Sequence, residues 1–264
     1  MAESLKTRAV FGTLASIVRP AMAAIMAQKW TGFKDLPQGG FIACPNHTSE
    51  IDPLVVAVPL YVNGYLPRFL AKDSLFRVPV LGTFLRATGQ IPVERTGLSA
   101  NRSLKAARSV IDNSGAILIY TEGTLTRDPD LWPMRGKTGA ARLALQTGAP
   151  VVPIVHWGTN EVMPRYAKKL NVFPRKTVRV HAGAPVDLSD LRDRPRTREI
   201  LEEATSRITN ALTRELAQLR GEEPPAVPWD PEKHGQAATG RGSFESAGTV
   251  TSGAEAAAVT ESRQ

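Results

Sequence analysis

The sequence is poor in the residues that build cross-links and most metal centres. Its 264 residues include one cysteine, Cys44, and four histidines. A single cysteine rules out a disulfide within the chain and a cysteine-rich zinc site, and it fits a reducing cytosol. His156, His181 and His234 stand apart from other candidate ligands. We therefore expect no metal site and interpret His156 and His181 as structural residues.

Two enzyme signatures are also missing. The sequence has no G-x-S-x-G, the nucleophile elbow of serine hydrolases. Residues 135–138 resemble the end of a phosphate-binding P-loop, but that motif requires glycine where this chain has Leu131. Aromatic residues make up only 6% of the chain, which is sparse for a surface that stacks single-stranded bases. We therefore expect neither nucleotide hydrolysis nor nucleic-acid binding.

No hydrophobic run is long enough to cross a bilayer without interruption. Spanning takes about 20 consecutive apolar residues, and Arg19 and Pro20 interrupt the apolar stretch 9–28. No small-x-small site of the kind that ends a signal peptide follows it before Lys29. Apolar residues recur at steps of three and four, which predicts an amphipathic helix with basic flanks. Such a helix covers the core or lies in a membrane interface, and a helix that spans the membrane is a third, less favoured alternative because of Arg19.

Charge is unevenly distributed along the chain. The net charge is +8, but residues 221–264 hold seven acidic and three basic residues, so residues 1–220 carry +12. By its charge alone, a folded part this basic suits nucleic acid, an anionic membrane surface or a phosphorylated substrate, and the low aromatic content argues against the first of these.

After Gly39 and Gly40, short apolar runs alternate with helical stretches. The runs predict strands at 41–44, 68–71, 90–93, 116–120, 151–155 and 177–181, and the stretches predict helices at 99–113, 138–147 and 196–220. This alternation is typical of an α/β domain with a largely parallel central sheet flanked by helices. We expect an amphipathic N-terminal helical segment at 1–36, the α/β domain at 37–220 and a disordered tail at 221–264, where large apolar residues are few.

One polar block follows the first strand of this domain and contains His47 and Asp52. Histidine is the natural general base near neutral pH, and a carboxylate on its other ring nitrogen fixes the tautomer. On a continuous helix the two residues would lie roughly 140° apart, so they meet only if the chain turns between them. Ser49 and Asp52 form a capping-box pattern, with Pro53 suited to the first helical turn.

Three further blocks follow strands. Residues 89–95 bring Arg95 to the carboxyl end of a strand, the edge where open α/β sheets bind ligands, and a guanidinium there suits a phosphate. Residues 120–124 contain Gly123, which permits a tight turn, and Thr124, which can hold an anion together with Arg127, Arg135 and Lys137. Residues 151–155 form an apolar strand interrupted by Pro153, which predicts an edge strand or a bulge.

Together the four blocks resemble the glycerolipid acyltransferase family, which includes 1-acylglycerol-3-phosphate (lysophosphatidic acid) acyltransferases. The family pattern Asn-His-x-x-x-x-Asp matches Asn46, His47 and Asp52, and its Gly-led strand ending in Arg matches residues 89–95. Its Glu-Gly-Thr-Arg block matches Glu122, Gly123 and Thr124, but Leu125 replaces the arginine, so Arg127 is the candidate for that place. Its apolar block around a proline matches residues 152–154, and Lys72 and Lys137 are also similar to family positions.

The resemblance implies an O-acyltransferase without a nucleophile of its own. It implies His47 as base and Asp52 as its orienting partner, with Arg95, Glu122, Gly123, Thr124, Arg127, Lys137 and Lys72 binding or shaping the substrate. The expected reaction moves an acyl group from acyl-CoA or acyl-carrier protein, with no other cofactor, to the sn-2 hydroxyl of lysophosphatidic acid.

The resemblance leaves the acceptor open. Glycerol-3-phosphate, another lysophospholipid or a glycolipid is an alternative acceptor, and a non-catalytic membrane-binding module is an alternative of another class. Lipid chemistry also favours the interfacial interpretation of the N-terminal helix, and hence peripheral attachment to the cytoplasmic face of an anionic membrane.

Overall fold

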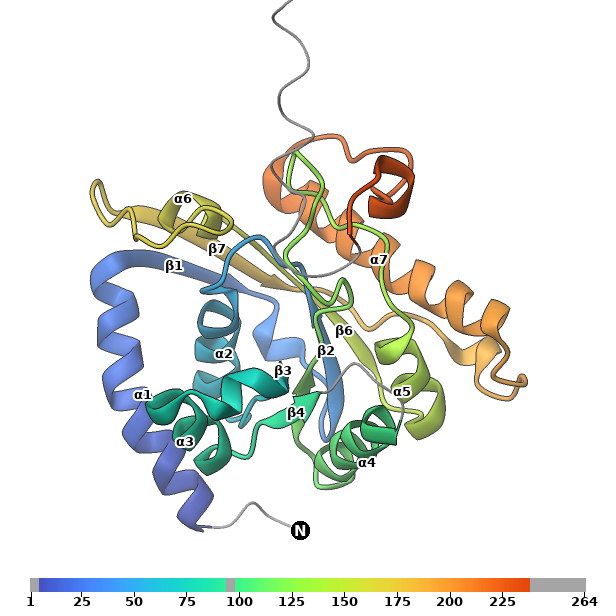
Figure 1. The fold of residues 1–264 in the computed structure, drawn as a ribbon, viewed down its shortest axis with the longest axis horizontal. Helices are drawn as coiled ribbons and strands as arrows, with labels where there is room; N and C mark the ends of the chain where they lie inside the picture. The colour runs from blue at the N-terminus through green and yellow to red at the C-terminus, as the bar shows by residue number, and fades with distance from the viewer. Residues whose placement is uncertain (1–4, 94–97, 238–264) are drawn as a thin grey trace, which may run out of the picture.

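The computed structural model of the protein describes residues 5–93 and 98–237. Its centre is a seven-stranded sheet in the order β1-β7-β6-β2-β5-β3-β4 (Figure 1). The strands are β1 Met26–Thr31, β2 Phe41–Pro45, β3 Arg68–Lys72, β4 Ile91–Val93, β5 Ala116–Leu118, β6 Val151–Trp157 and β7 Lys176–Ala182. Every neighbouring pair is parallel except β6 and β7. The carboxyl ends of β2 to β6 therefore lie at one edge of the sheet.

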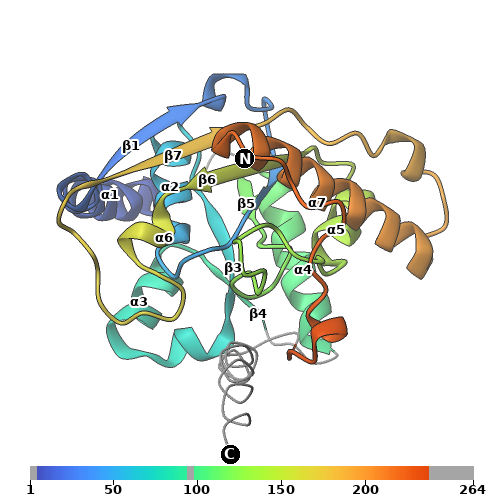
Figure 2. The ribbon, with the colours of Figure 1, turned by 90° about the horizontal axis from the view of Figure 1, so that it is seen from above.

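Helices cover both faces of this sheet (Figures 1 and 2). α1 and α2 lie over one face, and α4, α5 and α7 lie over the other. The helices are α1 Leu5–Ile25, α2 Asp52–Val62, α3 Pro79–Ala87, α4 Leu98–Asp112, α5 Gly139–Thr147, α6 Thr159–Val162 and α7 Arg198–Arg220. Short 3-10 helices are η1 Phe33–Asp35, η2 Asp73–Arg77, η3 Ser189–Leu191 and η4 Pro231–His234.

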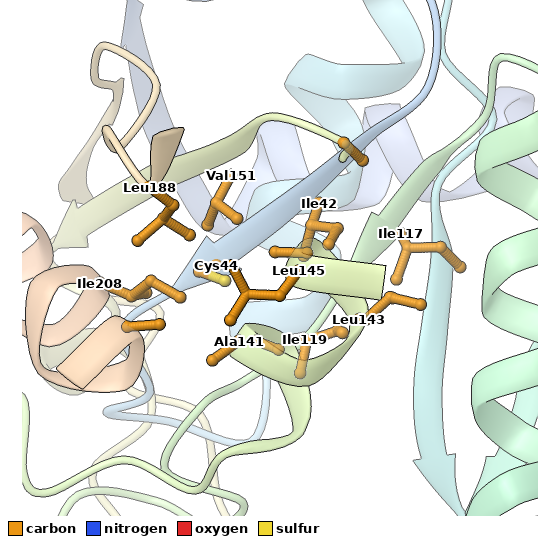
Figure 3. Packing of buried hydrophobic residues seen from close by; sticks show 14 of the residues in the cluster. Ile42, Cys44, Ile117, Ile119, Ala141, Leu143, Leu145, Val151, Leu188 and Ile208 are labelled. Carbon is orange, nitrogen blue, oxygen red and sulfur yellow. The ribbon is translucent and has the colours of Figure 1, made fainter. Parts of the chain in front are cut away.

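The core is divided into two layers by the sheet. Phe41 and Ala43 pack with α1 and α2, whereas Ile42 and Cys44 pack with α5 and α7, because successive side chains of a strand point to opposite faces. Figure 3 shows the second layer, where Cys44 lies among leucine, isoleucine and valine side chains. Burial raises the pKa of the Cys44 thiol, so this cysteine is an inert core residue.

The predicted α/β fold is confirmed, with all six predicted strands and the three predicted helices of the domain present. Thr197 caps α7, its side chain accepting from the N–H of Ile200 at 3.4 Å, and Gly221 ends the helix in the left-handed region. The prediction for Pro153 is wrong, because β6 is an interior strand that pairs with both β2 and β7. The Pro153 carbonyl accepts from the N–H of Gly183, just past the end of β7. Its missing N–H therefore faces the side where β7 has ended.

The N-terminal segment is not wholly helical. α1 stops at Ile25, and β1 begins at the next residue and pairs in parallel with β7 at the edge of the sheet. The boundary predicted at residue 36 therefore cuts through the α/β domain. The sequence of β1 has no strict alternation of apolar and polar residues, so its pattern did not separate it from the helix before it.

The prediction of a disordered tail from residue 221 is also wrong for the first part of that tail. Residues 221–237 fold back over α7 and contain η4. The carbonyl of Trp229 accepts from the N–H of Arg135, and the Trp229 indole donates to the Gln236 side chain at 3.0 Å. The Trp229 ring also stacks on His234 with centroids 3.5 Å apart. The rest of that prediction, 238–264, lies outside the described residues.

Candidate active site

His47 and Asp52 meet at the carboxyl end of β2, as the sequence predicted. Nδ1 of His47 lies 3.0 Å from Oδ2 of Asp52. The same oxygen accepts the backbone N–H groups of Thr48 and Ser49, each at 2.7 Å. Asp52 is completely buried, whereas the His47 side chain keeps 16% of its surface exposed. The turn between β2 and α2 thus brings the two side chains together.

The capping box is only half formed. α2 starts at Asp52, and the Asp52 carboxylate reaches back to the N–H of Ser49 as such a box requires. The Ser49 hydroxyl does not cap the first turn of α2. It accepts the N–H of Ile51, at 3.5 Å, and donates to the carbonyl of Met163 at 2.7 Å. Ser49 therefore ties the turn to the segment after α6.

Asp52 is held as an anion. Its burial alone would raise its pKa, but the nearby His156, the hydrogen bond from His47 and the N–H of Ser49 outweigh burial and hold the pKa below its usual value. An ionised carboxylate only accepts hydrogen bonds, so Nδ1 of His47 must be the donor. In the neutral imidazole, Nε2 then carries the lone pair of a base.

A second histidine adjoins the same carboxylate. Nε2 of His156 lies 3.6 Å from Oδ2 of Asp52 and 2.9 Å from the carbonyl of Asn46. His156 is fully buried, and this burial lowers its pKa. The interpretation of His156 as an isolated structural residue therefore missed this contact. The available signal was its place near the end of β6, the strand beside β2.

Glu122 lies beneath the His47 turn. It is 1% exposed and accepts the N–H of Met134 at 3.1 Å. Burial raises its pKa to about 8, although hydrogen bonds from Met134, Thr126 and His47 favour the charged form. The N–H of Thr126 donates to the carbonyl of His47 at 2.7 Å. The residues after β5 are therefore hydrogen-bonded to the backbone of His47 and help to fix the position of its turn.

Gly123 and Lys137 lie together at the surface of this edge. Gly123 has φ +69°, and a Cβ at this position would come 3.3 to 3.4 Å from the Cδ, Cε and Nζ atoms of Lys137. Lys137 donates its backbone N–H to the carbonyl of Thr121 at 2.8 Å, and Lys137 is exposed to solvent. Glycine thus allows the lysine side chain to lie across the turn. Thr124 is half-buried beside it.

The other predicted anion-binding residues fall in different places. Lys72 is exposed at the end of β3, opposite Val93 of β4. Arg127 is 1% exposed, so it does not present a guanidinium at the surface. The loop carrying Arg127 is held instead by Arg165, which donates to the carbonyls of Thr126 and Asp128 at 2.6 and 2.8 Å. Arg95 lies outside the described residues.

The arrangement suits proton transfer to and from a substrate hydroxyl. It offers a buried carboxylate, an imidazole with a partly exposed edge and a lysine that can attract an anion. Among residues 5–93 and 98–237 no group of three metal-ligating side chains occurs.

Comparisons with known proteins find acyltransferases. Residues 28–157 match the protein family described as Acyltransferase. The chain is 31% identical over 136 residues to a chloroplastic 1-acyl-sn-glycerol-3-phosphate acyltransferase of Brassica napus, covering 50% of this chain and 38% of that protein. It is 27% identical over 192 residues to the 1-acyl-sn-glycerol-3-phosphate acyltransferase of Borreliella burgdorferi, covering 72% of each.

A solved structure shares the fold. The 1-acyl-sn-glycerophosphate acyltransferase of Thermotoga maritima aligns with a TM-score of 0.63 and 19% identity, covering 83% of each chain. The chain spans only 38% of the length of the Brassica napus protein and 42% of that of a second plant relative, a chloroplastic 1-acyl-sn-glycerol-3-phosphate acyltransferase of Arabidopsis thaliana.

Proposed function

Because residues 28–157 match the acyltransferase family, we propose that the protein transfers a fatty acyl group from an acyl thioester to the sn-2 hydroxyl of 1-acylglycerol-3-phosphate, which yields phosphatidic acid for phospholipid synthesis. The observation that carries the proposal is the 3.0 Å contact between His47 and a buried, ionised Asp52 at the carboxyl edge of the sheet. The matched family and the names of its curated relatives support the choice of reaction.

The proposed chemistry needs no nucleophile from the protein. Nε2 of His47 takes the proton of the acceptor hydroxyl as its oxygen attacks the thioester carbonyl. The tetrahedral intermediate collapses, the C–S bond breaks and the thiolate of the carrier takes the proton back from His47. Asp52 orients the imidazole and stabilises its charged form between the two proton transfers.

Recognition of the acceptor phosphate falls to the cations at the same edge. Lys137 lies across Gly123, and Lys72 stands at the end of β3. We assign Arg95, which follows β4 in the sequence, to the same phosphate. Glu122 and Thr124 belong to the turn after β5 next to His47, and we assign them to shaping the substrate site. The thioester of acyl-CoA or acyl-carrier protein is already activated, so the proposal includes no further cofactor.

Membrane attachment is assigned to α1. By length and composition this helix could cross a membrane. It packs along the domain, however: Phe11 is buried and its ring stacks on Tyr61 of α2 with centroids 6.3 Å apart. A helix that lies against its own domain with basic residues around it suits the interface of an anionic leaflet. We therefore place the protein peripherally on the cytoplasmic face of the membrane.

The direct test is product analysis by mass spectrometry. The purified full chain is incubated with a mixture of glycerol-3-phosphate, lysophosphatidic acid and other lysolipids, and with acyl-CoA or acyl-carrier protein donors. We expect phosphatidic acid as the main product. A different acylated acceptor would replace the assigned substrate, and no acylated product with any donor would contradict acyl transfer.

A further inference from the structure

Large apolar side chains are exposed almost entirely on one side of this protein. Among the described residues, fourteen such side chains are exposed, and only Val227 lies outside the N-terminal helix and strand, α2, residues 73–87 and the loop between α6 and β7. α5, α7 and the described side chains of α4, from residue 102 onward, contribute none. The others are Leu5, Ile17, Trp30, Leu54, Val62, Leu75, Val78, Val80, Leu81, Phe84, Leu170, Val172 and Phe173.

The first strongly apolar surface is α3. Gly82 is its only buried residue, and a Cβ there would come 2.1 Å from the carbonyl oxygen of Phe76, so α3 packs closely on η2 through this glycine. Val80 is 79% exposed, and Leu81 and Phe84 are 42% and 38% exposed. A helix whose outer face meets water normally carries polar residues there.

The second is the loop 163–175 between α6 and β7. Phe173 is 90% exposed, and Leu170 and Val172 are each exposed by more than two fifths. The loop is joined to α1, because the Arg175 guanidinium donates to the carbonyls of Ala23 and Met26.

These surfaces flank α1 on the same side of the molecule. In Figure 1, α1, α3 and the loop beside α6 all lie toward the left. Figure 2 is turned about the horizontal axis, so left remains left, and the three are again found there. α7 lies on the opposite side in both views. Large exposed apolar patches of this kind mark contact sites for proteins or membranes.

The charge around the apolar residues selects the partner. Residues 72–87 contain Lys72, Arg77 and Arg86 against one acid, Asp73, which is already paired with Arg77 at 2.6 Å. The stretch 168–176 contains four basic residues and no acidic ones. Apolar side chains ringed by cations fit the interface of an anionic bilayer.

We infer that α3 and the loop 163–175 insert into the same anionic lipid surface that α1 binds. The membrane contact is then a face with three parts, which we call the lipid-facing patch: α1, α3 and the loop tip at Phe173. η2 and α3 follow directly on the carboxyl end of β3, at the edge that holds His47. A lipid surface at α3 therefore lies beside the entrance that an acceptor must use. This last consequence rests on the proposed function, whereas the membrane contact itself does not.

Vesicle co-sedimentation of the full chain tests the contact. The variants are Val80→Asp with Phe84→Asp, and separately Phe173→Asp, measured with phosphatidylcholine vesicles and with vesicles that also contain phosphatidylglycerol. We expect each to bind the anionic vesicles about 10-fold or more weakly than the wild type. Val227→Asp is the matched control, since Val227 is 72% exposed and lies outside the patch. Wild-type binding by both patch variants, or an equal loss in Val227→Asp, would overturn the inference.

Labelling gives a second readout that does not depend on lost binding. Val80→Cys and Phe173→Cys are labelled with an environment-sensitive dye, while the native Cys44 is fully buried and stays unlabelled. Lipids with brominated acyl chains should quench both dyes but not a dye at Gln218→Cys on α7. Equal quenching at all three positions, or none at Val80 and Phe173, would contradict insertion.

Activity separates this inference from the proposed function. With a short-chain acceptor that stays monomeric in water, the patch variants should match wild-type turnover, while turnover on vesicle-borne acceptor should fall with binding. If the wild type transfers no acyl group, the proposed function fails and the vesicle and dye measurements still decide the membrane contact.

Discussion

His156 and His47 converge on one oxygen atom of the same carboxylate. Oδ2 of Asp52 lies 3.0 Å from Nδ1 of His47 and 3.6 Å from Nε2 of His156. His47 is partly exposed and His156 is not. One imidazole can therefore meet a substrate, while the other acts only through Asp52 and the backbone.

Replacing His47 should remove the base. We expect His47→Ala to lower kcat by about 10²- to 10⁴-fold, the usual contribution of general base catalysis, with a melting temperature close to that of the wild type. The measurement is initial rate with lysophosphatidic acid and acyl-CoA, beside circular dichroism to confirm folding. His181→Ala is the control, because His181 belongs to β7, two strands away from β2 in the sheet, and contacts Thr31 and Glu215. Turnover of His47→Ala within a few-fold of wild type would refute the assignment.

His156 should act as a positioning residue. In His156→Gln the amide can still donate to the carbonyl of Asn46, but the imidazole that favours the Asp52 anion is lost. We expect kcat to fall about 10-fold with little change in KM. We also expect the acidic limb of the plot of kcat against pH to shift, because Asp52 is less strongly held as an anion. A fall in thermal stability with an unchanged profile would instead make His156 a core residue only.

Glu122 should make stability depend on pH. Its pKa is about 8 in the folded protein against an ordinary value of 4.5, so the folded state binds the proton more tightly than the unfolded state. Stability then falls as the pH rises from 4.5 toward 8 and levels off above it, with a slope of at most about 1.4 kcal/mol per pH unit. Glu122→Gln cannot ionise and should show a flatter curve in urea unfolding between pH 5 and 8.5.

The control for this curve is Glu202→Gln. Glu202 is a surface residue that accepts from Arg198 at 2.8 Å, and its loss should leave the pH dependence parallel to the wild type. If the Glu122→Gln curve is also parallel, Glu122 is ionised in the folded protein.

Lys137 should bind the acceptor phosphate. We expect Lys137→Gln to raise KM for lysophosphatidic acid about 10-fold while kcat changes little, because a charge-assisted contact to phosphate is lost without moving His47. Lys105→Gln, an exposed lysine of α4, should leave both constants unchanged. An unchanged acceptor KM in Lys137→Gln would leave Lys72 and Arg95 as the phosphate ligands.

The sequence predicted what local patterns determine. His47 and Asp52 belong to one strand-turn-helix unit, so five residues of spacing and the capping pattern were enough to bring them together. The strands of the domain were found because buried runs separated by glycine are distinctive. Both successes depend on neighbours in the chain.

Features that depend on distant partners were missed. β1 is a strand because it pairs with β7, about 150 residues away, and nothing in its own composition requires this. His156 reaches Asp52 only because β6 lies beside β2. Residues 221–237 are polar and proline-rich, yet Trp229 fixes them to Arg135 through a backbone contact. Arg127 shows the same limit, because a charged residue in a polar stretch gives no sign in the sequence that it is buried.

The direct succession of α1 and β1 has a mechanical consequence. Ile25 ends the helix and Met26 starts an edge strand whose six residues are all paired with β7. No flexible linker therefore separates the helix from the sheet, so the two cannot reorient freely relative to each other. A surface that binds α1 would therefore also set the distance and tilt of the His47 turn relative to that surface, because α1 leads directly into a strand of the sheet.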